Sequence, residues 1–195
     1  MRDSYRIFLA GVGGQGTLLA TMVLAEAAVY AGHNVVTSEI HGMSQRGGVV
    51  ESTVMIGDIK SPIISDGEAD LLLGFEPLET YRAIRKCSAD SVVISSSVPV
   101  TPHSVTIGKS SYPDIDKLFA FIKPRVKRLI TLDAQTLAEQ AGSVLSANVV
   151  MLGAVASSGV LPVPREAFEE TIRTKTKAKF VEANLRAFDL GFGTP

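Results

Sequence analysis

A glycine-rich turn near the start of the chain constrains its fold more than any other feature. The turn, Gly-Val-Gly-Gly-Gln-Gly, runs from Gly11 to Gly16 between two apolar segments. The run 5–10 before it predicts a short buried strand, and the segment 17–31 after it predicts a covered helix that ends at Gly32. Residues 34–38 predict a second strand. Strand, turn, helix and strand in this order are typical of a βαβ unit.

Strand and helix patterns alternate along the rest of the chain. We expect further strands at 49–56, 69–73, 91–95 and 128–132, weaker ones at 61–65 and 104–107, and helices at 77–86, 114–123, 133–142, 148–158, 164–174 and 177–190. The strand at 49–56 alternates apolar with polar residues, so we expect it to be half exposed or near an edge. No repeat or linker divides the chain. We therefore predict one domain, residues 1–195, of the α/β class: a Rossmann-like three-layer α/β/α sandwich with a mostly parallel sheet.

The glycine turn also predicts a binding site. Gly11, Gly13 and Gly16 match the pattern G-x-G-x-x-G between a strand and a helix, where backbone N–H groups at the helix N-terminus can hold an anion. Glu39, at the end of the second predicted strand, occupies the place of the acid that binds a ribose in dinucleotide folds. This pattern leaves three alternatives open: NAD or FAD, another anion, or a purely structural turn.

A polar loop follows the second predicted strand and should lie beside the glycine turn, because neighbouring parallel strands end at the same edge of a sheet. In this loop His41 could act as a base or donor, and Arg46 offers a fork suited to carboxylate or phosphate. The same loop could instead form an interface with a partner protein. No residue is assigned a catalytic role, and no metal site is expected. The candidate ligand-facing residues are Gly11, Gly13, Gly14, Gln15, Gly16, Glu39, His41, Ser44, Gln45, Arg46, Gly47 and Gly48.

Composition excludes several functions. Nineteen Lys and Arg against twenty Asp and Glu leave a net charge of −1, so no global field attracts nucleic acid or a membrane surface. The single cysteine, Cys87, cannot form an intrachain disulfide or supply the several thiolates of an iron–sulfur cluster. The N-terminus is polar, and the longest apolar stretch is too short to span a bilayer. We expect a cytoplasmic protein.

Several stretches together resemble one known family. They are Gly11–Gly16, the loop Ser-Glu-Ile-His-Gly-Met-Ser-Gln-Arg-Gly-Gly at 38–48, Glu-Ala-Asp-Leu-Leu-Leu-Gly-Phe-Glu at 68–76, and the segments 148–154 and 179–188. This combination is similar to the beta subunits of indolepyruvate ferredoxin oxidoreductases, within the gamma-subunit family of 2-oxoacid:ferredoxin oxidoreductases. The similarity spans nearly the whole chain, and the loop at 41–48 is its most specific part.

The resemblance implies a function that the chain performs only with a large alpha subunit. The family's enzyme converts an aryl 2-oxo acid such as indolepyruvate, with coenzyme A, to the aryl-acetyl-CoA and carbon dioxide, and reduces ferredoxin. Thiamine diphosphate and the 4Fe–4S clusters are expected on the alpha subunit, so this chain alone would hold no cofactor. Gly13 to Gly16 and Arg46 would bind an anion, while His41 and Gln45 would orient the substrate or a partner loop.

Two other hypotheses remain open beside this one. The chain could be a regulatory module that binds NAD, FAD or another nucleotide through Gly11–Gly16 and Glu39. It could also be a purely structural subunit whose glycine loops serve packing. Dinucleotide binding by the isolated chain would distinguish the first of these from a subunit of an oxidoreductase.

Overall fold

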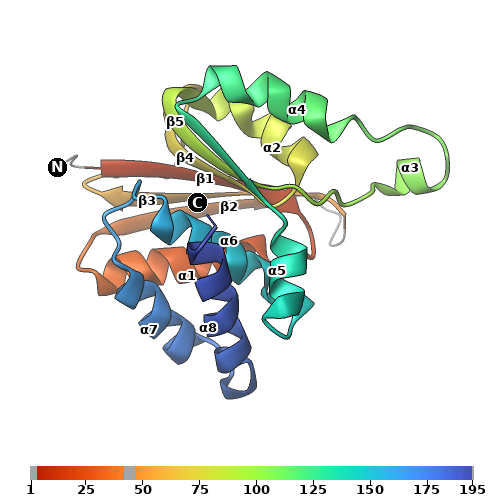
Figure 1. Ribbon diagram of the computed structural model, residues 1–195. Helices are drawn as coiled ribbons and strands as arrows, with labels where there is room; N and C mark the ends of the chain where they lie inside the picture. Colours follow the sequence, from red (N-terminus) through yellow and green to blue (C-terminus); the bar gives the residue numbers. More distant parts are fainter. Residues whose placement is uncertain (1–3, 42–46, 195) are drawn as a thin grey trace.

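The computed structural model describes residues 4–41 and 47–194, and in this part of the chain six strands form one sheet (Figure 1). The order across the sheet is β2-β3-β1-β4-β5-β6. Strands β1, β4, β5 and β6 are parallel, whereas β3 is antiparallel to both of its neighbours, β1 and β2. The strands are β1 (Ser4–Val12), β2 (Val35–His41), β3 (Val49–Gly57), β4 (Ala69–Gly74), β5 (Cys87–Ser96) and β6 (Arg128–Leu132).

Helices cover both faces of this sheet, which confirms the α/β class and the three-layer sandwich (Figure 1). On one face α2 (Pro77–Ala83) and α4 (Ile115–Ile122) enclose a small core around Phe8 and Leu72. The larger core, around Leu9 and Phe168, lies on the other face. The helices of that face are α1 (Thr17–Tyr30), α5 (Ala134–Gln140), α6 (Ala147–Ser157), α7 (Arg165–Lys175) and α8 (Ala178–Phe192). Short helical turns are η1 (Ile84–Lys86), η2 (Lys123–Arg125), η3 (Val144–Ser146) and α3 (His103–Thr106).

The ends of several helices follow local capping chemistry, and their predicted positions are confirmed. The Asp114 carboxylate caps α4 by accepting a hydrogen bond from the N–H of Lys117 at 3.2 Å. Asp133 caps α5 in the same way, at 2.8 Å from the N–H of Thr136. Gly32 follows α1 with φ of 85°, a left-handed conformation in which glycine is favoured at helix C-termini.

Four predictions about strands are wrong. β3 is an interior strand between β1 and β2, so β1 and β2 are not neighbours and β2 is the edge strand. The polar residues of β3 suggested an exposed strand, but the irregular segment 58–68 contacts them. The Thr53 hydroxyl donates a hydrogen bond to the carbonyl of Pro62 at 2.8 Å. Residues 61–65 form no strand. Residues 103–106 form the helical turn α3, because the carbonyl of Pro102 accepts from the N–H groups of Val105 and Thr106.

Helices α6 and α8 approach each other so closely that their backbones touch. A Cβ added at Gly153 would lie 2.1 Å from the carbonyl oxygen of Phe188, and one added at Gly191 would lie 1.9 Å from that of Val150. Near the start of α6, the Ser146 hydroxyl donates to the side-chain oxygen of Asn184, which lies in the middle of α8, at 2.6 Å. The start of α6 therefore faces the middle of α8, and from there the two helices continue in the same direction.

The connection between β5 and α4, residues 97–113, projects from the body of the molecule as an arm (Figure 1). One buried carboxylate, that of Glu76, holds both ends of this arm. Its Oε1 accepts hydrogen bonds from the N–H of Val100 at 3.3 Å and from the hydroxyl of Tyr112. Burial, helped by the nearby Glu76 carboxylate, raises the pKa of Tyr112 above its usual value, so the phenol stays protonated and donates.

Candidate functional site

A pocket opens beside the glycine turn, where β1, β4 and β5 end. Its volume is about 340 Å³, within the range of roughly 300–1,000 Å³ that is typical of small-molecule sites. The N-terminal ends of α1, α5 and α6 form part of its wall. The described residues that line it are Gly14, Gln15, Gly16, Leu19, Phe75, Ser96, Val98, Val100, Ala134, Gln135, Val144, Leu145, Ala147, Asn148 and Met151.

The side chain of Gln15 stabilises the glycine turn through two hydrogen bonds to the backbone. Its side-chain oxygen accepts from the N–H of Val12 at 2.9 Å, and its side-chain nitrogen donates to the carbonyl of Phe75 at 2.8 Å. The amide therefore ties the end of β1 to the end of β4. Space beside the turn is tight, since a Cβ at Gly11 would lie 2.9 Å from the Thr17 hydroxyl. Gln15 thus has a structural task in addition to bordering the pocket.

Gly16 shows why the last glycine of the motif is needed. It is the N-cap of α1 and has φ of 76°, which disfavours any residue with a side chain. Its carbonyl accepts from the side-chain nitrogen of Asn148 at 3.2 Å, and an added Cβ would lie only 2.7 Å from that nitrogen. A glycine at this position therefore allows α6 to approach the start of α1.

Asn148 brings an unsatisfied polar atom to the pocket. The residue is 2% exposed, and its side-chain oxygen has no hydrogen-bond partner, although its nitrogen is bonded to Gly16. A buried polar atom without a partner costs about 1–3 kcal/mol. Asn148 lines the pocket, but its side-chain oxygen is itself buried, so a ligand would reach this atom only after the side chain moves.

Two of the three helix N-termini at the pocket are suited to an anion, whereas the third, that of α5, is already capped by the Asp133 carboxylate. Neither α1 nor α6 has a capping side chain or an acidic residue in its first turn, so the N–H groups at both helix N-termini lack a local anionic partner. None of the described residues that line the pocket has a titratable side chain. The described groups can therefore bind and orient a ligand, but they cannot transfer protons to or from it.

The structure brings the end of the second predicted loop to the glycine turn. The N–H of Gly13 donates to the carbonyl of Gly48 at 2.8 Å, and the N–H of Gly47 donates to the carbonyl of Gly13 at 3.3 Å. His41 is the last residue of β2, where its backbone is paired with Val50. Three further candidates of this loop, Ser44, Gln45 and Arg46, lie outside the described residues.

Glu39 is not brought together with the glycine turn. It is exposed on the edge strand β2, and it borders a separate groove between β2 and α1 with Thr21, Met22 and Val35 among its lining residues. The antiparallel strand β3 separates it from β1. The ribose-binding geometry of a dinucleotide fold, which needs the acid on the strand beside the turn, is therefore not formed.

Several residues of the pocket were missed from the sequence. Asn148 is 132 residues from Gly16, and Ser96 and Leu145 belong to segments without a recognisable motif. Two signals point to Asn148: it begins one of the segments, 148–154, that carry the family resemblance, and it is a polar residue at the start of a helix that is apolar up to Ser157. Such a residue usually has a specific hydrogen-bonding task, because burying an unpaired amide is unfavourable.

Within residues 4–41 and 47–194, no cluster of three or more His, Cys, Asp and Glu could hold a metal ion. The ring nitrogen Nε2 of His33 lies 2.9 Å from the carbonyl of Pro162, a contact that joins α1's end to the segment before α7. The described helices also include none that is both long and apolar enough to cross a membrane.

We expect the lone thiol, Cys87, to be unreactive. Burial at the start of β5 raises its pKa to about 12, so almost no thiolate is present near neutral pH. Alkylation by iodoacetamide at pH 8 should be about a thousandfold slower in the folded chain than in urea, because only the thiolate reacts. Mass spectrometry of timed samples measures this. Comparable rates in the two states would contradict the buried environment.

Comparison with known proteins now identifies the family. The model of the family described as pyruvate ferredoxin/flavodoxin oxidoreductase matches residues 6–194. The chain belongs to this family. Relatives named indolepyruvate oxidoreductase subunit IorB are 36–41% identical; the one from Methanothermobacter thermautotrophicus is 40% identical over 190 residues, 97% of each chain.

Solved structures of this oxidoreductase family have the same fold. The gamma subunit of a keto/oxoacid ferredoxin oxidoreductase from Geobacter sulfurreducens superposes with a TM-score of 0.70, at 28% identity and 97% coverage of both chains. The 2-oxoglutarate:ferredoxin oxidoreductase from Magnetococcus marinus, solved with 2-oxoglutarate, coenzyme A and succinyl-CoA, gives 0.75 over all of this chain and 31% of that longer chain. Its 21% identity supports the fold alone. The predicted membership of the 2-oxoacid:ferredoxin oxidoreductase gamma-subunit family is thus confirmed.

Proposed function

We propose that this chain is the small subunit of an indolepyruvate:ferredoxin oxidoreductase. The complex converts indolepyruvate or another arylpyruvate, with coenzyme A, to aryl-acetyl-CoA and carbon dioxide, and reduces ferredoxin. The choice of substrate follows the names of the relatives that match almost the whole chain at 36–41% identity. We expect the complex in the cytoplasm.

The large alpha subunit supplies the redox centres in this proposal. Thiamine diphosphate provides the carbanion chemistry of decarboxylation, and 4Fe–4S clusters carry the electrons towards ferredoxin. The residues of this chain do not suit a cluster, because it has one cysteine and that thiol is half-buried with a raised pKa. This supports our proposal that the clusters lie on the partner subunit, and we place thiamine diphosphate there with them.

The single structural observation behind the role of this chain is the pocket at the glycine turn. It combines two uncapped helix N-termini with a buried, unpaired amide oxygen, and its described lining has no acid, base or thiol. Such a site binds a co-substrate but performs no proton transfer. We assign it to coenzyme A, whose phosphates suit the N–H groups at the helix N-termini. Arg46 and His41 would add to the same site from the loop after β2.

Reconstitution tests this function. We expect the chain to co-purify with a co-expressed large subunit, and the complex to reduce ferredoxin with indolepyruvate and coenzyme A. Neither subunit alone should turn over, and pyruvate and 2-oxoglutarate should be poorer substrates. The rival function, a nucleotide-binding regulatory module, predicts instead that the isolated chain binds NAD or FAD tightly in a titration. That result, or an active large subunit alone, would refute the proposal.

A further inference from the structure

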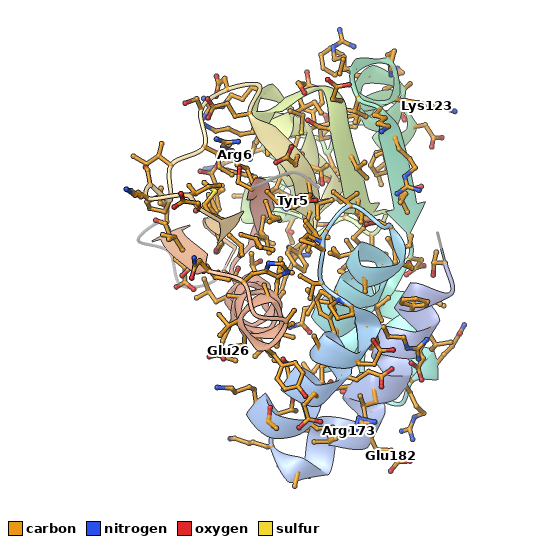
Figure 2. The ribbon with its side chains drawn as sticks, turned by 90° about the vertical axis from the view of Figure 1, so that its left-hand side faces the viewer. Tyr5, Arg6, Glu26, Lys123, Arg173 and Glu182 are labelled. Carbon is orange, nitrogen blue, oxygen red and sulfur yellow. The ribbon has the colours of Figure 1, made fainter. Side chains whose placement is uncertain are left out.

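One side of the molecule combines an open strand edge with an apolar helix face. Within the described residues β2 is paired only with β3, so no strand lies along its outer side. Helix α1 lies next to β2 at the outer edge of its helix layer, as Figure 2 shows for the helix marked by Glu26. A groove of about 400 Å³ separates the two elements, and Met22, Val29 and Thr37 are among the residues that line it.

The edge of β2 lacks the features that normally prevent pairing with another chain. Its seven residues include no Pro or Lys, and its register with β3 runs without a bulge from Val35 to His41. Natural proteins usually blunt an exposed edge with such residues, with a bulge or with a covering segment. A regular edge strand without these features indicates that a further strand pairs with it in the assembled protein.

The outer side of α1 is apolar where solvent would favour polar residues. Leu18, Met22 and Val29 are 41%, 40% and 54% exposed, and with the half-buried Ala25 they form one stripe at helical spacing. A helix that is apolar on all sides is typical of a buried position. The carboxylate beside the stripe, that of Glu26, forms an ion pair with Lys175 at 3.2 Å, so its charge is compensated within the chain.

The sequence of β2 is self-complementary in antiparallel pairing. A two-fold axis perpendicular to the sheet keeps each face on its own side, and directly opposite residues share a face, so the axis passes beside one residue. The longest pairing places it at Ser38, the middle of β2. Glu39 then lies opposite Thr37 of the second copy, and Ile40 opposite its Val36. An axis at Glu39 would instead place two carboxylates opposite each other, which is unfavourable.

The stripe on α1 fits the same axis. Helix and strand run in opposite directions and are joined by residues 31–34, so the middle of α1 lies level with Ser38. Leu18 therefore comes opposite Val29 of the second copy, and Met22 opposite its Ala25, a large residue against a small one. Because α1 packs on β3 and β2, the two copies of the helix would lie roughly 10–14 Å apart, and large side chains fill that gap together with the groove.

We propose that the edge of β2 and the stripe on α1 bind a second copy of this chain, so that two six-stranded sheets join into one continuous sheet. The contact is isologous, because both copies contribute the same residues. This inference goes beyond the proposed function and applies to the chain by itself as well as within the complex. The large subunit is the competing occupant of this surface, and the experiment separates the two.

Cysteine cross-linking tests the centre of the pairing. Directly opposite residues of an antiparallel pair have Cα atoms about 4.5–5.5 Å apart, within reach of a disulfide. Ser38→Cys should therefore form a covalent dimer under a mild oxidant, seen on a non-reducing gel at twice the 20.7 kDa of the chain. Glu39→Cys is the matched control, because its two copies would lie about 7–8 Å apart and should cross-link far less. The natural chain, which retains Cys87, should form no covalent dimer.

Sedimentation equilibrium measures the association in solution, and we expect the natural chain to be dimeric. Thr37→Lys should tighten the dimer about fivefold, because it places two ammonium groups opposite the two Glu39 carboxylates, and Thr37→Glu should weaken it by a similar factor. Met22→Lys should weaken the dimer about tenfold, since it puts a charge into the stripe. Ile107→Lys charges an exposed apolar residue of the arm instead and should leave the association unchanged.

Three results would overturn the proposal. The first is a natural chain that stays monomeric at high micromolar concentration. The second is a Glu39→Cys variant that cross-links as fast as Ser38→Cys, since the strands would then pair in another register or only by collision. The third concerns the complex, in which Ser38→Cys should still cross-link. Loss of this cross-link whenever the large subunit is bound would assign the surface to that subunit.

Discussion

Replacement of Gly153 by alanine should destabilise the chain by about 3 kcal/mol, because α6 and α8 touch through their backbones. The new Cβ would lie 2.1 Å from the carbonyl oxygen of Phe188 and 2.7 Å from the N–H nitrogen of Phe192. No rotamer can relieve a clash with backbone, so α8 must move away from α6. The midpoint of urea unfolding, followed by circular dichroism, should fall markedly. A variant that does not fold at all would appear as loss of soluble protein.

Gly193→Ala is the matched control for this prediction. Gly193 is the C-cap of α8 and has φ of −79°, which any residue can adopt. The nearest atoms to an added Cβ are 3.6 Å away, an ordinary contact distance. We expect no loss of stability there, since alanine has a higher helix propensity than glycine. If Gly153→Ala unfolds at the same urea concentration as Gly193→Ala, the close approach of the helices is contradicted.

Replacement of Glu76 by alanine should cost about 3 kcal/mol and release the arm at residues 97–113. The side chain is 2% exposed, and its Oε2 caps α2 by accepting from the N–H of Glu79 at 2.9 Å. Loss of an N-cap costs about 1 kcal/mol, and the Tyr112 hydroxyl and Val100 N–H would lose their acceptor at a further 1–3 kcal/mol. Trypsin cleavage at Lys109, an exposed residue of the arm, should become faster.

Two further variants give stabilities and cleavage rates with which those of Glu76→Ala are compared. Tyr112→Phe removes one of the three donors to this carboxylate, so we expect a loss of about 1 kcal/mol and an intermediate rate of cleavage. Glu68→Ala removes a solvent-exposed carboxylate that accepts from the N–H of Ser65 at 3.0 Å, and should change stability by less than about 0.5 kcal/mol. Equal cleavage rates in the natural protein and Glu76→Ala would show that the arm is held by other contacts.

Local chemistry explains why most helices could be predicted from the sequence. Asp114 and Asp133 bond to N–H groups three residues later, and Gly32 adopts its left-handed conformation within one turn of the helix it ends. None of these effects depends on distant parts of the chain. The glycine turn was found for the same reason, since its role follows from its own backbone and from the elements on either side.

Strand order and the second half of the site depend on distant contacts and could not be predicted. The place of β3 between β2 and β1 is decided by pairing along both of its edges. Its polar Thr53 is buried under the segment that contains Pro62, so alternation alone indicated an edge strand incorrectly. Likewise, Asn148 reaches Gly16 only through the packing of α6 against α1.

Because β3 pairs with a neighbour along both edges, the sheet is held together independently of the length of the segment between β2 and β3. Since β2 and β3 are antiparallel and pair up to His41 and Val50, the two ends of the segment that joins them are already held together. The entropy cost of closing a segment between fixed ends grows only slowly with its length, so residues can be inserted there at little cost to folding. Different members of one enzyme family can thus change the chemistry presented beside the glycine turn without rebuilding the sheet beneath it.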